Sequence, residues 1–296
     1  MKSNEMVSLR VAVASGKGGT GKTTVATSLA LSLAAPPLFL DGDVEAPDAH
    51  LFLKPTFERR QEVGLLIPQV DEARCTHCGR CAEVCQYHAI AVLGEKVLVF
   101  PQLCHGCGSC AWVCPENAIM ETLAVIGVLE SGPATGGVHF ARGMLNVGEP
   151  MATPVIRQLK QWAAPQPGQV VIIDASPGTS CPVVEAARGA DFLLLVTEPT
   201  PFGLHDLRLA VQVGRALKLP MGVVINRDGL GDSSVTDFCA VEELPILLRI
   251  PFDRAIAAGI AQGQPLVEIY PEYTARFQEL WTWMVEQTGQ AARVGV

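Results

Sequence analysis

The chain has 296 residues, a net charge of −8 at pH 7, and 49% hydrophobic and 18% charged residues. This composition is typical of a globular protein with room for one large α/β domain plus a small insert, and it excludes a disordered chain. The excess of acidic residues argues against nonspecific binding of DNA or RNA, which requires cations that neutralise phosphates, so we expect no nucleic-acid partner.

A membrane location is also disfavoured, although the mean hydropathy of +0.28 is high. The apolar runs at 170–173 and 192–196 have the length of buried strands and are far too short to span a bilayer. Residues 1–8 lack the apolar core of a signal peptide, and residues 291–296 lack the basic amphipathic pattern of a membrane-surface helix. We therefore expect a cytoplasmic protein without a membrane partner.

The first predicted element is a buried strand at 9–15, which leads into a glycine-rich turn and a helix from about 22 to 34. The turn, Gly16-Lys-Gly-Gly-Thr-Gly-Lys22-Thr23, matches the phosphate-binding pattern G-x-x-x-x-G-K-[ST] in the strand–helix context that this motif requires. Its glycines allow backbone N–H groups to surround phosphate oxygens, while Lys22 would reach the β- and γ-phosphates and Thr23 would offer its hydroxyl to Mg²⁺. A glycine-rich turn without a ligand is the alternative, which the context disfavours.

Carboxylates stand at the ends of two further predicted strands. Asp41 and Asp43 close a short strand that begins at residue 38, and Asp174 ends a later apolar strand in the manner of a Walker B motif. Such residues can hold magnesium-bound water or orient an attacking water, and the amide of Gly178 can contact a γ-phosphate. A lone aspartate at a strand end is more often a capping residue, but three of them beside a phosphate-binding loop favour a catalytic role.

Eight of the ten cysteines fall between residues 75 and 114, which indicates a metal-binding segment and not a disulfide framework in a cytoplasmic chain. The pattern C-x2-C-x2-C-x3-C occurs twice, and each cysteine of the second run lies 29 positions after its counterpart (104 − 75), as an internal duplication would produce. This spacing resembles bacterial two-cluster ferredoxins, in which the fourth cysteine of each run ligates the other 4Fe–4S cluster. The predicted ligand sets are Cys75, Cys78, Cys81 and Cys114 for one cluster and Cys85, Cys104, Cys107 and Cys110 for the other.

Two structural zinc ions are the alternative, because C-x2-C pairs also bind zinc. Zinc would leave the third and fourth cysteines of each run at awkward spacing, whereas Pro115 matches the Cys-Pro ending of the ferredoxin pattern. The spacing therefore favours iron–sulfur clusters. The remaining cysteines, Cys181 and Cys239, are expected to be small buried apolar residues.

The cysteine segment interrupts a longer α/β pattern. Residues 122–149 are apolar but rich in glycine, which favours a hairpin or loop over the insert. Beyond residue 154 predicted strands alternate with predicted helices; the strands are 170–174, 192–197, 221–226 and 246–250, and the helices are 154–163, 204–218 and 272–288.

Continuous apolar strands that alternate with helices predict an α/β fold, in which a mostly parallel sheet is covered by helices on both faces. We expect a P-loop ATPase domain made of residues 1–71 and 122–296. Between its two parts, residues 72–121 are expected to form a small ferredoxin-like α+β insert.

The nine residues of the loop resemble the deviant Walker A motif of the MinD/ParA/Mrp-type ATPases, within the CobQ/CobB/MinD/ParA nucleotide-binding family; they are Gly16, Lys17, Gly18, Gly19, Thr20, Gly21, Lys22, Thr23 and Thr24. The resemblance covers nearly the whole chain outside the cysteine segment and implies binding of ATP or ADP with Mg²⁺. It also implies an ATP-dependent homodimer, because in this family a signature lysine, here Lys17, crosses the dimer interface to touch the partner's nucleotide.

The resemblance assigns roles to residues outside the loop as well. Asp43 matches the hydrolytic position of switch I, and Asp174 and Gly178 fall in a segment similar to switch II. The residues that match contacts to the nucleotide base are Asn226, Arg227, Pro251 and Asp253. Two positions depart from the family pattern, since Asp48 stands where asparagine is common and Ser176 replaces the first proline of switch II.

These features lead to three hypotheses about function. The first is an ATPase in which ATP-driven dimer closure gates electron transfer through the two clusters to a redox partner protein, because the insert lies between the two switch segments. The second is an ATP-dependent carrier that delivers iron–sulfur clusters or another metal cofactor to a partner. The third is a MinD/ParA-like positioning ATPase, against which the acidic composition and the plain C-terminus weigh.

Overall fold

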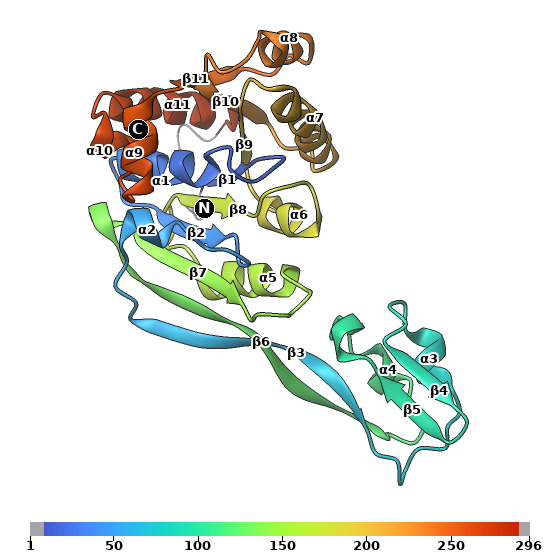
Figure 1. The fold of residues 1–296 in the computed structure, drawn as a ribbon. Coiled ribbons are helices and arrows are strands. Elements are labelled where there is room, and N and C mark those ends of the chain that lie inside the picture. The colour runs from blue at the N-terminus through green and yellow to red at the C-terminus, as the bar shows by residue number, and fades with distance from the viewer. Residues whose placement is uncertain (1–8, 290–296) are drawn as a thin grey trace, which may run out of the picture.

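The computed structural model describes residues 9–289, which form a nine-stranded sheet flanked by helices (Figure 1). In spatial order the strands are β11 (Ile246–Pro251), β10 (Met221–Asp228), β9 (Phe192–Thr197), β1 (Arg10–Ala14), β8 (Val171–Ala175), β2 (Leu38–Gly42), β7 (His139–Leu145), β6 (Ile119–Pro133) and β3 (Arg59–Val70). The strands from β11 to β7 run parallel, and β6 and β3 add an antiparallel edge. The expected mostly parallel α/β sheet is confirmed. Residues 1–8 and 291–296, for which the sequence analysis made predictions, lie outside the described part of the chain.

Helices cover both faces of the sheet because its central strands are apolar on both sides. Strand β9, for example, is buried at every position. One face packs against α1 (Lys22–Ser32), α2 (His50–Leu53), α9 (Arg254–Ala261), α10 (Leu266–Ile269) and α11 (Tyr273–Gln287). The other face packs against α5 (Thr153–Trp162), α6 (Cys181–Ala187), α7 (Pro201–Ala216) and α8 (Ser234–Val241). Among residues 9–289, no helix combines the length and apolarity needed to cross a bilayer.

The observed elements lie close to the expected ones, with differences at their ends. The strand expected at 192–197 has the observed bounds, and the helix expected from 22 to 34 ends at Ser32. Helix α7 begins before the expected residue 204, because the hydroxyl of Thr200 caps it by accepting a hydrogen bond of 3.0 Å from the amide of Gly203. Strand β3 was not predicted.

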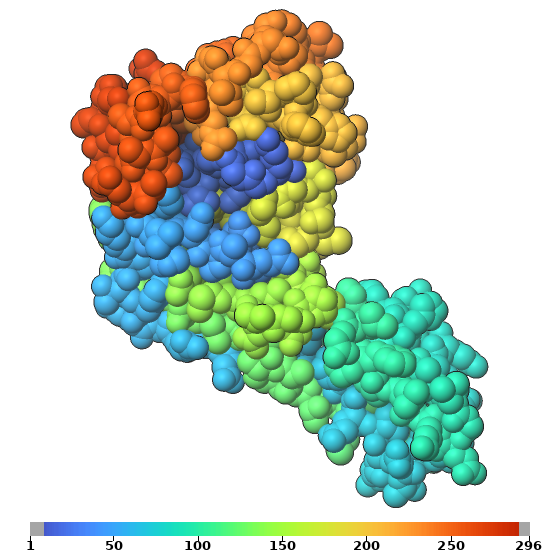
Figure 2. Space-filling view, viewed as in Figure 1, coloured from blue at the N-terminus to red at the C-terminus, as the bar shows by residue number. Residues whose placement is uncertain are grey.

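Strands β3 and β6 form a long antiparallel hairpin, termed the arm, that carries the cysteines away from the rest of the sheet (Figures 1 and 2). Their pairing runs from Arg59 opposite Ser131 at the root to Val70 opposite Ile119 at the tip. Residues 71–118, termed the cysteine lobe, lie beyond the tip. The lobe contains α3 (Arg80–Val84), β4 (Ile90–Leu93), β5 (Lys96–Val99), a short 3₁₀ turn (Pro101–Leu103) and α4 (Ser109–Trp112). It protrudes from the body of the molecule in Figure 2.

The glycine-rich stretch 122–149 forms the hairpin of β6 and β7, and this hairpin belongs to the main sheet instead of lying over the insert. The expected hairpin is therefore present, but its expected location was wrong. Two of its glycines sit within β6 because neighbouring backbone comes too close for a side chain. A Cβ atom at Gly132 would lie 1.8 Å from the carbonyl oxygen of Thr56, and one at Gly127 would lie 2.4 Å from that of Met144.

A row of charged residues crosses five neighbouring strands at matching register. Asp174 on β8 lies opposite Asp41 on β2, which lies opposite Arg142 on β7, followed by Glu130 on β6 and Arg60 on β3. Glu130 is buried and accepts hydrogen bonds from Arg142 at 2.8 Å and from Arg60 at 2.9 Å. Because directly opposed residues point to the same face of a sheet, this row links the carboxylates at the centre of the sheet with the root of the arm.

Removal of the central carboxylate of this ion network should destabilise the protein strongly. E130A would leave Arg142, whose side chain is 13% exposed, without its buried partner. Breaking a buried pair on one side costs about 3–5 kcal/mol, and we expect a loss of about 3 kcal/mol in the free energy of unfolding. The control is E242A, which breaks the exposed pair with Arg215 and should cost less than about 1 kcal/mol. Urea unfolding measures both; equal losses would contradict the prediction.

Candidate functional site

The predicted phosphate-binding loop lies at the carboxyl edge of the sheet, between β1 and α1. Its tight packing requires glycine at two positions. Gly21 has a φ of 87°, and a Cβ atom there would lie 2.2 Å from the side-chain nitrogen of Asn226, which donates a hydrogen bond of 2.8 Å to the carbonyl oxygen of Thr20. A Cβ atom at Gly16 would lie 2.3 Å from the carbonyl oxygen of Asp206. The loop is therefore held from outside by residues far away in sequence.

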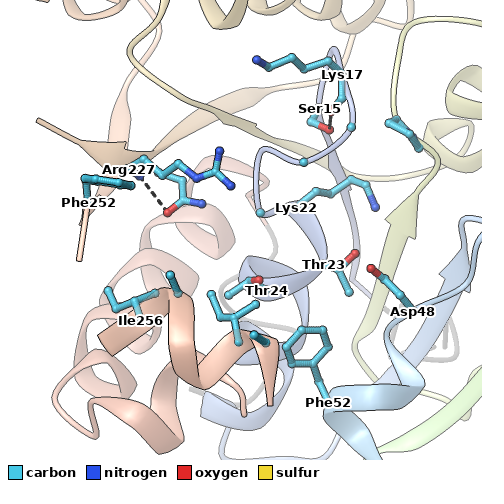
Figure 3. Close-up of a pocket in the computed structure, with 18 of the residues that line it drawn as sticks. Ser15, Lys17, Lys22, Thr23, Thr24, Asp48, Phe52, Arg227, Phe252 and Ile256 are labelled. Carbon is cyan, nitrogen blue, oxygen red and sulfur yellow. Dashed lines mark hydrogen bonds between the residues drawn. The ribbon is translucent and has the colours of Figure 1, made fainter. Parts of the chain in front are cut away.

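This loop borders a cavity of about 390 Å³ that has two chemically different ends (Figure 3). At one end, Lys22 and the hydroxyl of Thr23 lie near Asp48. At the other end lie Arg227 and Phe252. Hard oxygen and amine groups at one end and an aromatic ring at the other suit a phosphorylated ligand with a planar base.

The structure brings most of the predicted nucleotide residues to this cavity. Those in its wall are Lys17, Gly18, Gly19, Gly21, Lys22, Thr23, Thr24, Asp43, Asn226, Arg227, Pro251 and Asp253. Asp253 also caps α9, accepting hydrogen bonds of 2.6 and 3.1 Å from the amides of Ala255 and Ile256. Sequence reasoning missed Phe52, Phe252 and Ile256, which also line the cavity. Phe252 lies between Pro251 and Asp253, so its position in that loop was the available signal.

Five predicted residues stay outside the cavity wall, namely Gly16, Thr20, Asp41, Asp174 and Gly178. Asp41 is fully buried and accepts hydrogen bonds from the amides of Ala49 (3.1 Å) and Asp43 (3.3 Å), so it orders the segment that follows β2. The amide of Gly178, expected to face a γ-phosphate, donates instead to the carbonyl oxygen of Ser15 at 2.9 Å. This hydrogen bond joins the segment that follows β8 to the start of the loop.

Lys22 and Asp174 form a buried ion pair directly beneath the loop. The ammonium nitrogen of Lys22 lies 2.6 Å from one oxygen of Asp174 and 4.0 Å from an oxygen of Asp43. The second oxygen of Asp174 and the hydroxyl of Thr20 are buried without a hydrogen-bond partner among residues 9–289. Unpaired buried oxygens are costly, and they fit a magnesium-bound phosphate ligand whose coordinated water supplies the missing donors.

The side chains around the ion pair carry more negative than positive charge. Burial lowers the pKa of Lys22, but Asp174, Asp43 and Asp41 raise it by more. Burial raises the pKa of Asp43 to about 6, against the opposing effect of Lys22. Burial and the neighbouring Asp174 hold the pKa of Asp41 well above its usual range. A second cation would relieve this excess, which again suits Mg²⁺.

Lys17 takes part in a second ion pair, which the sequence analysis did not predict. Its ammonium group contacts the carboxylate of Glu198 in the same chain, and Arg227 binds the other oxygen of that carboxylate at 3.0 Å. Burial raises the pKa of Glu198, but Lys17 and Arg227 lower it by more, so that the net shift is downward. Glu198 follows β9 directly, and an acidic residue at the end of a buried strand was the signal that could have identified it.

The eight clustered cysteines line two separate cavities in the cysteine lobe. One, termed the outer cavity, is lined by Cys75, Cys78, Cys81 and Cys114. The other, termed the arm-side cavity because Leu66 and Pro68 of β3 also border it, is lined by Cys85, Cys104, Cys107 and Cys110. The fourth cysteine of each run thus lies with the first three of the other run.

Backbone amides donate to sulfur atoms at positions that repeat through the lobe. His77 and Gly106 donate to Cys75 and Cys104, at 3.4 and 3.5 Å. Ala89 and Ala118 donate to Cys85 and Cys114, both at 3.3 Å. Each pair of bonds is related by the same shift of 29 residues (106 − 77 and 118 − 89), so the sequence duplication is also a structural one. Amides aimed at sulfur stabilise thiolates, which suits a group held by deprotonated cysteines.

These cysteines do not form a site for a single metal ion, and neither do the other potential ligands among the described residues. Within residues 9–289, no group of three or more His, Cys, Asp or Glu side chains is close enough to hold a single metal ion. The two cysteines outside the lobe also differ, because Cys239 is buried as expected while Cys181 is exposed at the start of α6. The expectation of a buried Cys181 was therefore wrong.

Comparison with known proteins identifies several relatives of this chain. A family model described as the CobQ/CobB/MinD/ParA nucleotide binding domain matches residues 11–266. Two uncharacterized proteins of Methanocaldococcus jannaschii are similar along nearly their whole length: MJ0579 is 28% identical and MJ0578 29% identical, and the matches cover 93% and 94% of this chain and 97% of each relative.

Solved structures with the same fold include two named proteins. The septum site-determining protein MinD of Pyrococcus horikoshii, in complex with Mg-ADP, matches with a TM-score of 0.58 and 18% identity over 98% of this chain and 100% of that one. A ParA family ATPase from Chlorobium tepidum matches with a TM-score of 0.53 and 15% identity, over 95% and 98%. The fold around the cavity is thus the MinD-like P-loop fold.

A side chain at Gly21 should destabilise the protein, whereas one at Gly18 should not. G21A would force a left-handed residue and displace Asn226 from its hydrogen bond with Thr20, at a cost of about 2–3 kcal/mol. Gly18 has a negative φ and open space where a Cβ atom would lie, so G18A is the matched control. Chemical denaturation without nucleotide measures both variants. A similar loss of stability in G18A would count against the packing argument.

Proposed function

The chain belongs to the CobQ/CobB/MinD/ParA nucleotide-binding family, and on that premise we propose that it is a MinD/ParA-like ATPase that binds Mg-ATP, hydrolyses it and switches between monomer and homodimer. The observation that carries this proposal is the buried Lys22–Asp174 pair beneath a glycine loop, with an unpaired carboxylate oxygen beside it. The pair is a charged site prepared for phosphate and magnesium.

The residues of this site have separable roles in the proposed reaction. Lys22 binds the β- and γ-phosphates, and Thr23 with Asp174 supports magnesium directly or through its water. Asp43 lines the cavity and orients the attacking water; with a pKa of about 6 it is largely ionised at neutral pH and is able to accept a proton. Asn226 and Arg227, with Phe252, hold the base at the other end of the cavity.

The proposed dimer depends on Lys17. Its side chain is 31% exposed and is held by Glu198 of its own chain, so it is not committed to the cavity beside it. In Figure 3 it extends away from Lys22. We propose that the pair with Glu198 is the resting position of Lys17, and that closure of the dimer transfers it to the partner's nucleotide. The exchange replaces one anionic partner of the lysine by another, so its charge stays compensated.

The comparisons favour a MinD/ParA-like switch over an electron-transfer enzyme as the main function, because the structural relatives named above are MinD and ParA-type ATPases. Such a switch presents different surfaces in its two nucleotide states and so recruits or releases a partner. The acidic net charge of −8 supports a protein partner over nucleic acid or an anionic membrane, and a cytoplasmic location.

A second function is supported by the cysteine lobe. We propose that residues 72–121 form a ferredoxin-like insert that retains two 4Fe–4S clusters, one in each cysteine cavity, while residues 1–71 and 122–296 form the ATPase domain. The support is the division of eight cysteines into two sets of four and the amides that point at their sulfurs. A cubane binds each thiolate through a different iron, so its ligands are spread more widely than those of a single ion.

Bound clusters would supply one-electron redox chemistry, and they raise the question of transfer to a partner. Each cavity offers four cysteines, enough to complete the coordination of a cubane, which favours retained clusters over a carrier that hands them on. The arm joins the lobe to the sheet through β3 and β6, and β7 connects β6 to the neighbouring strands that bear Asp41 and Asp174. This arrangement supports coupling of the nucleotide state to electron transfer from the lobe to a redox partner.

The ATPase proposal predicts different defects for the two key side chains. With Mg²⁺ and a nonhydrolysable ATP analogue, the wild type should become a dimer in light scattering, whereas K17A should stay monomeric. D43N should still dimerise with ATP but hydrolyse it about 100-fold more slowly, because the water loses its proton acceptor. K96A, at an exposed position in the lobe, is the control and should behave as wild type. A wild type that remains monomeric, or a D43N variant with normal turnover, would refute the proposal.

The cluster proposal predicts metal content. Protein purified without oxygen should contain about eight irons and eight sulfides per chain, and C107S should lower the iron content to about half. C181S removes an equally exposed thiol outside the lobe and should change nothing. Stoichiometric zinc without sulfide in the wild type would overturn the proposal.

A further inference from the structure

The two cysteine cavities are related by the internal duplication but differ in charge at three equivalent positions. Arg80 borders the outer cavity, and the residue 29 positions later, Ser109, borders the arm-side cavity. Val92 borders the outer cavity, and its equivalent, Glu121, borders the arm-side cavity. Both of these differences make the arm-side cavity the more negative one, whereas the third acts in the opposite sense, because Glu116 at the outer cavity is the equivalent of Tyr87 at the arm-side cavity.

Glu121 lies directly against the loop that carries the arm-side cysteines. A Cβ atom at Gly108, which follows Cys107, would lie 3.4 Å from a carboxylate oxygen of Glu121. The outer cavity has an acidic neighbour too, Glu116, but Arg80 offsets it. With neutral histidines, the bordering side chains therefore sum to zero at the outer cavity and to −1 at the arm-side cavity.

The burial of the cysteines also differs between the two cavities. Cys104 and Cys110 of the arm-side cavity are 8% and 9% exposed, whereas their equivalents Cys75 and Cys81 are only partly buried. The cover comes from the arm and from a stacked pair of rings: Gly106 packs against the backbone of Leu66 on β3, and Tyr87 stacks on His105 with ring centroids 3.7 Å apart. Two of the four arm-side cysteines thus have less access to water than their equivalents, whereas Cys107, like Cys78, is exposed.

We propose that the two clusters are electronically unequal, and that the arm-side cluster has the lower reduction potential. This inference rests on the proposed clusters. Reduction adds one electron, and hence one negative charge, to a cluster; a nearby carboxylate and exclusion of water both disfavour that charge, while the guanidinium of Arg80 favours it. The first electron therefore resides on the outer cluster, and the second reduces the arm-side cluster.

The order of potentials sets the direction of electron transfer through the lobe. Electrons move downhill from the arm-side cavity to the outer cavity, away from the main sheet and toward the free end of the lobe. Cys78 of the outer cavity is exposed, so a redox partner can reach the cluster on which the electron comes to rest; Cys107 of the arm-side cavity is exposed as well. In this arrangement the lobe delivers electrons outward, and its outer end is the surface for the acceptor.

Redox titration of the anaerobic holoprotein with dithionite, followed by electron paramagnetic resonance, tests this order. The wild type should show two one-electron waves. E121Q should raise the lower potential alone, and R80Q should lower the higher potential alone, so that each variant brings the waves closer together. E83Q removes an exposed acid on α3 that borders neither cavity and should leave both waves in place.

The outcomes distinguish a failure of the cluster proposal from a failure of the proposed order of potentials. Iron and sulfide near background would remove the cluster proposal and this inference with it. Full cluster content with one coincident wave, or an E121Q variant whose higher potential moves instead, would overturn the inference and leave the clusters in place. Iron content measured on each variant ensures that a shifted wave comes from an intact lobe.

Discussion

Asp41 and Asp174 lie side by side on neighbouring strands at the centre of the sheet, and both are fully buried. Two carboxylates in such surroundings are tolerable only if cations and hydrogen bonds compensate them. Lys22 provides that compensation as the first residue of α1, where the helix N-terminus adds its own positive end. The loop, the two strand ends and the first helix are thus held in place by one electrostatic requirement. The same requirement leaves a carboxylate oxygen unpaired, and so makes the site receptive to a magnesium-bound phosphate.

The charged row extends this constraint across the sheet. Arg142 lies between the buried Asp41 and the buried Glu130, so the charge balance of the centre and that of the arm root share a residue. The arm is therefore anchored by hydrogen-bonded charges at the sheet, while its far end carries the lobe. A change at the nucleotide site has a continuous, densely packed route to that anchor.

Local motifs could be predicted well from the amino-acid sequence, whereas contacts between distant residues could not. The loop motif and the cysteine spacing have meaning within about 30 residues of sequence; in the structure most of the loop residues line one cavity, and the eight cysteines divide into two sets of four. Strand β3 escaped notice because its residues include Pro68 and a charged stretch at 59–62; it is a strand because β6 pairs with it. Glu198 gains its importance from Lys17, which is 181 positions away. The amide of Gly178 donates a hydrogen bond to the carbonyl oxygen of Ser15, a contact that no local sequence pattern predicts.

The place of β8 between β1 and β2 sets an order of assembly on the ribosome. Those two strands are made early, but the strand that separates them is complete only at Ala175. By then the arm and the whole lobe, which end at Pro133, have already left the exit tunnel in order of synthesis. The nascent chain thus possesses all eight lobe cysteines in a self-contained hairpin unit before its phosphate cradle has a central strand. The topology alone therefore places synthesis of the lobe before completion of the nucleotide site.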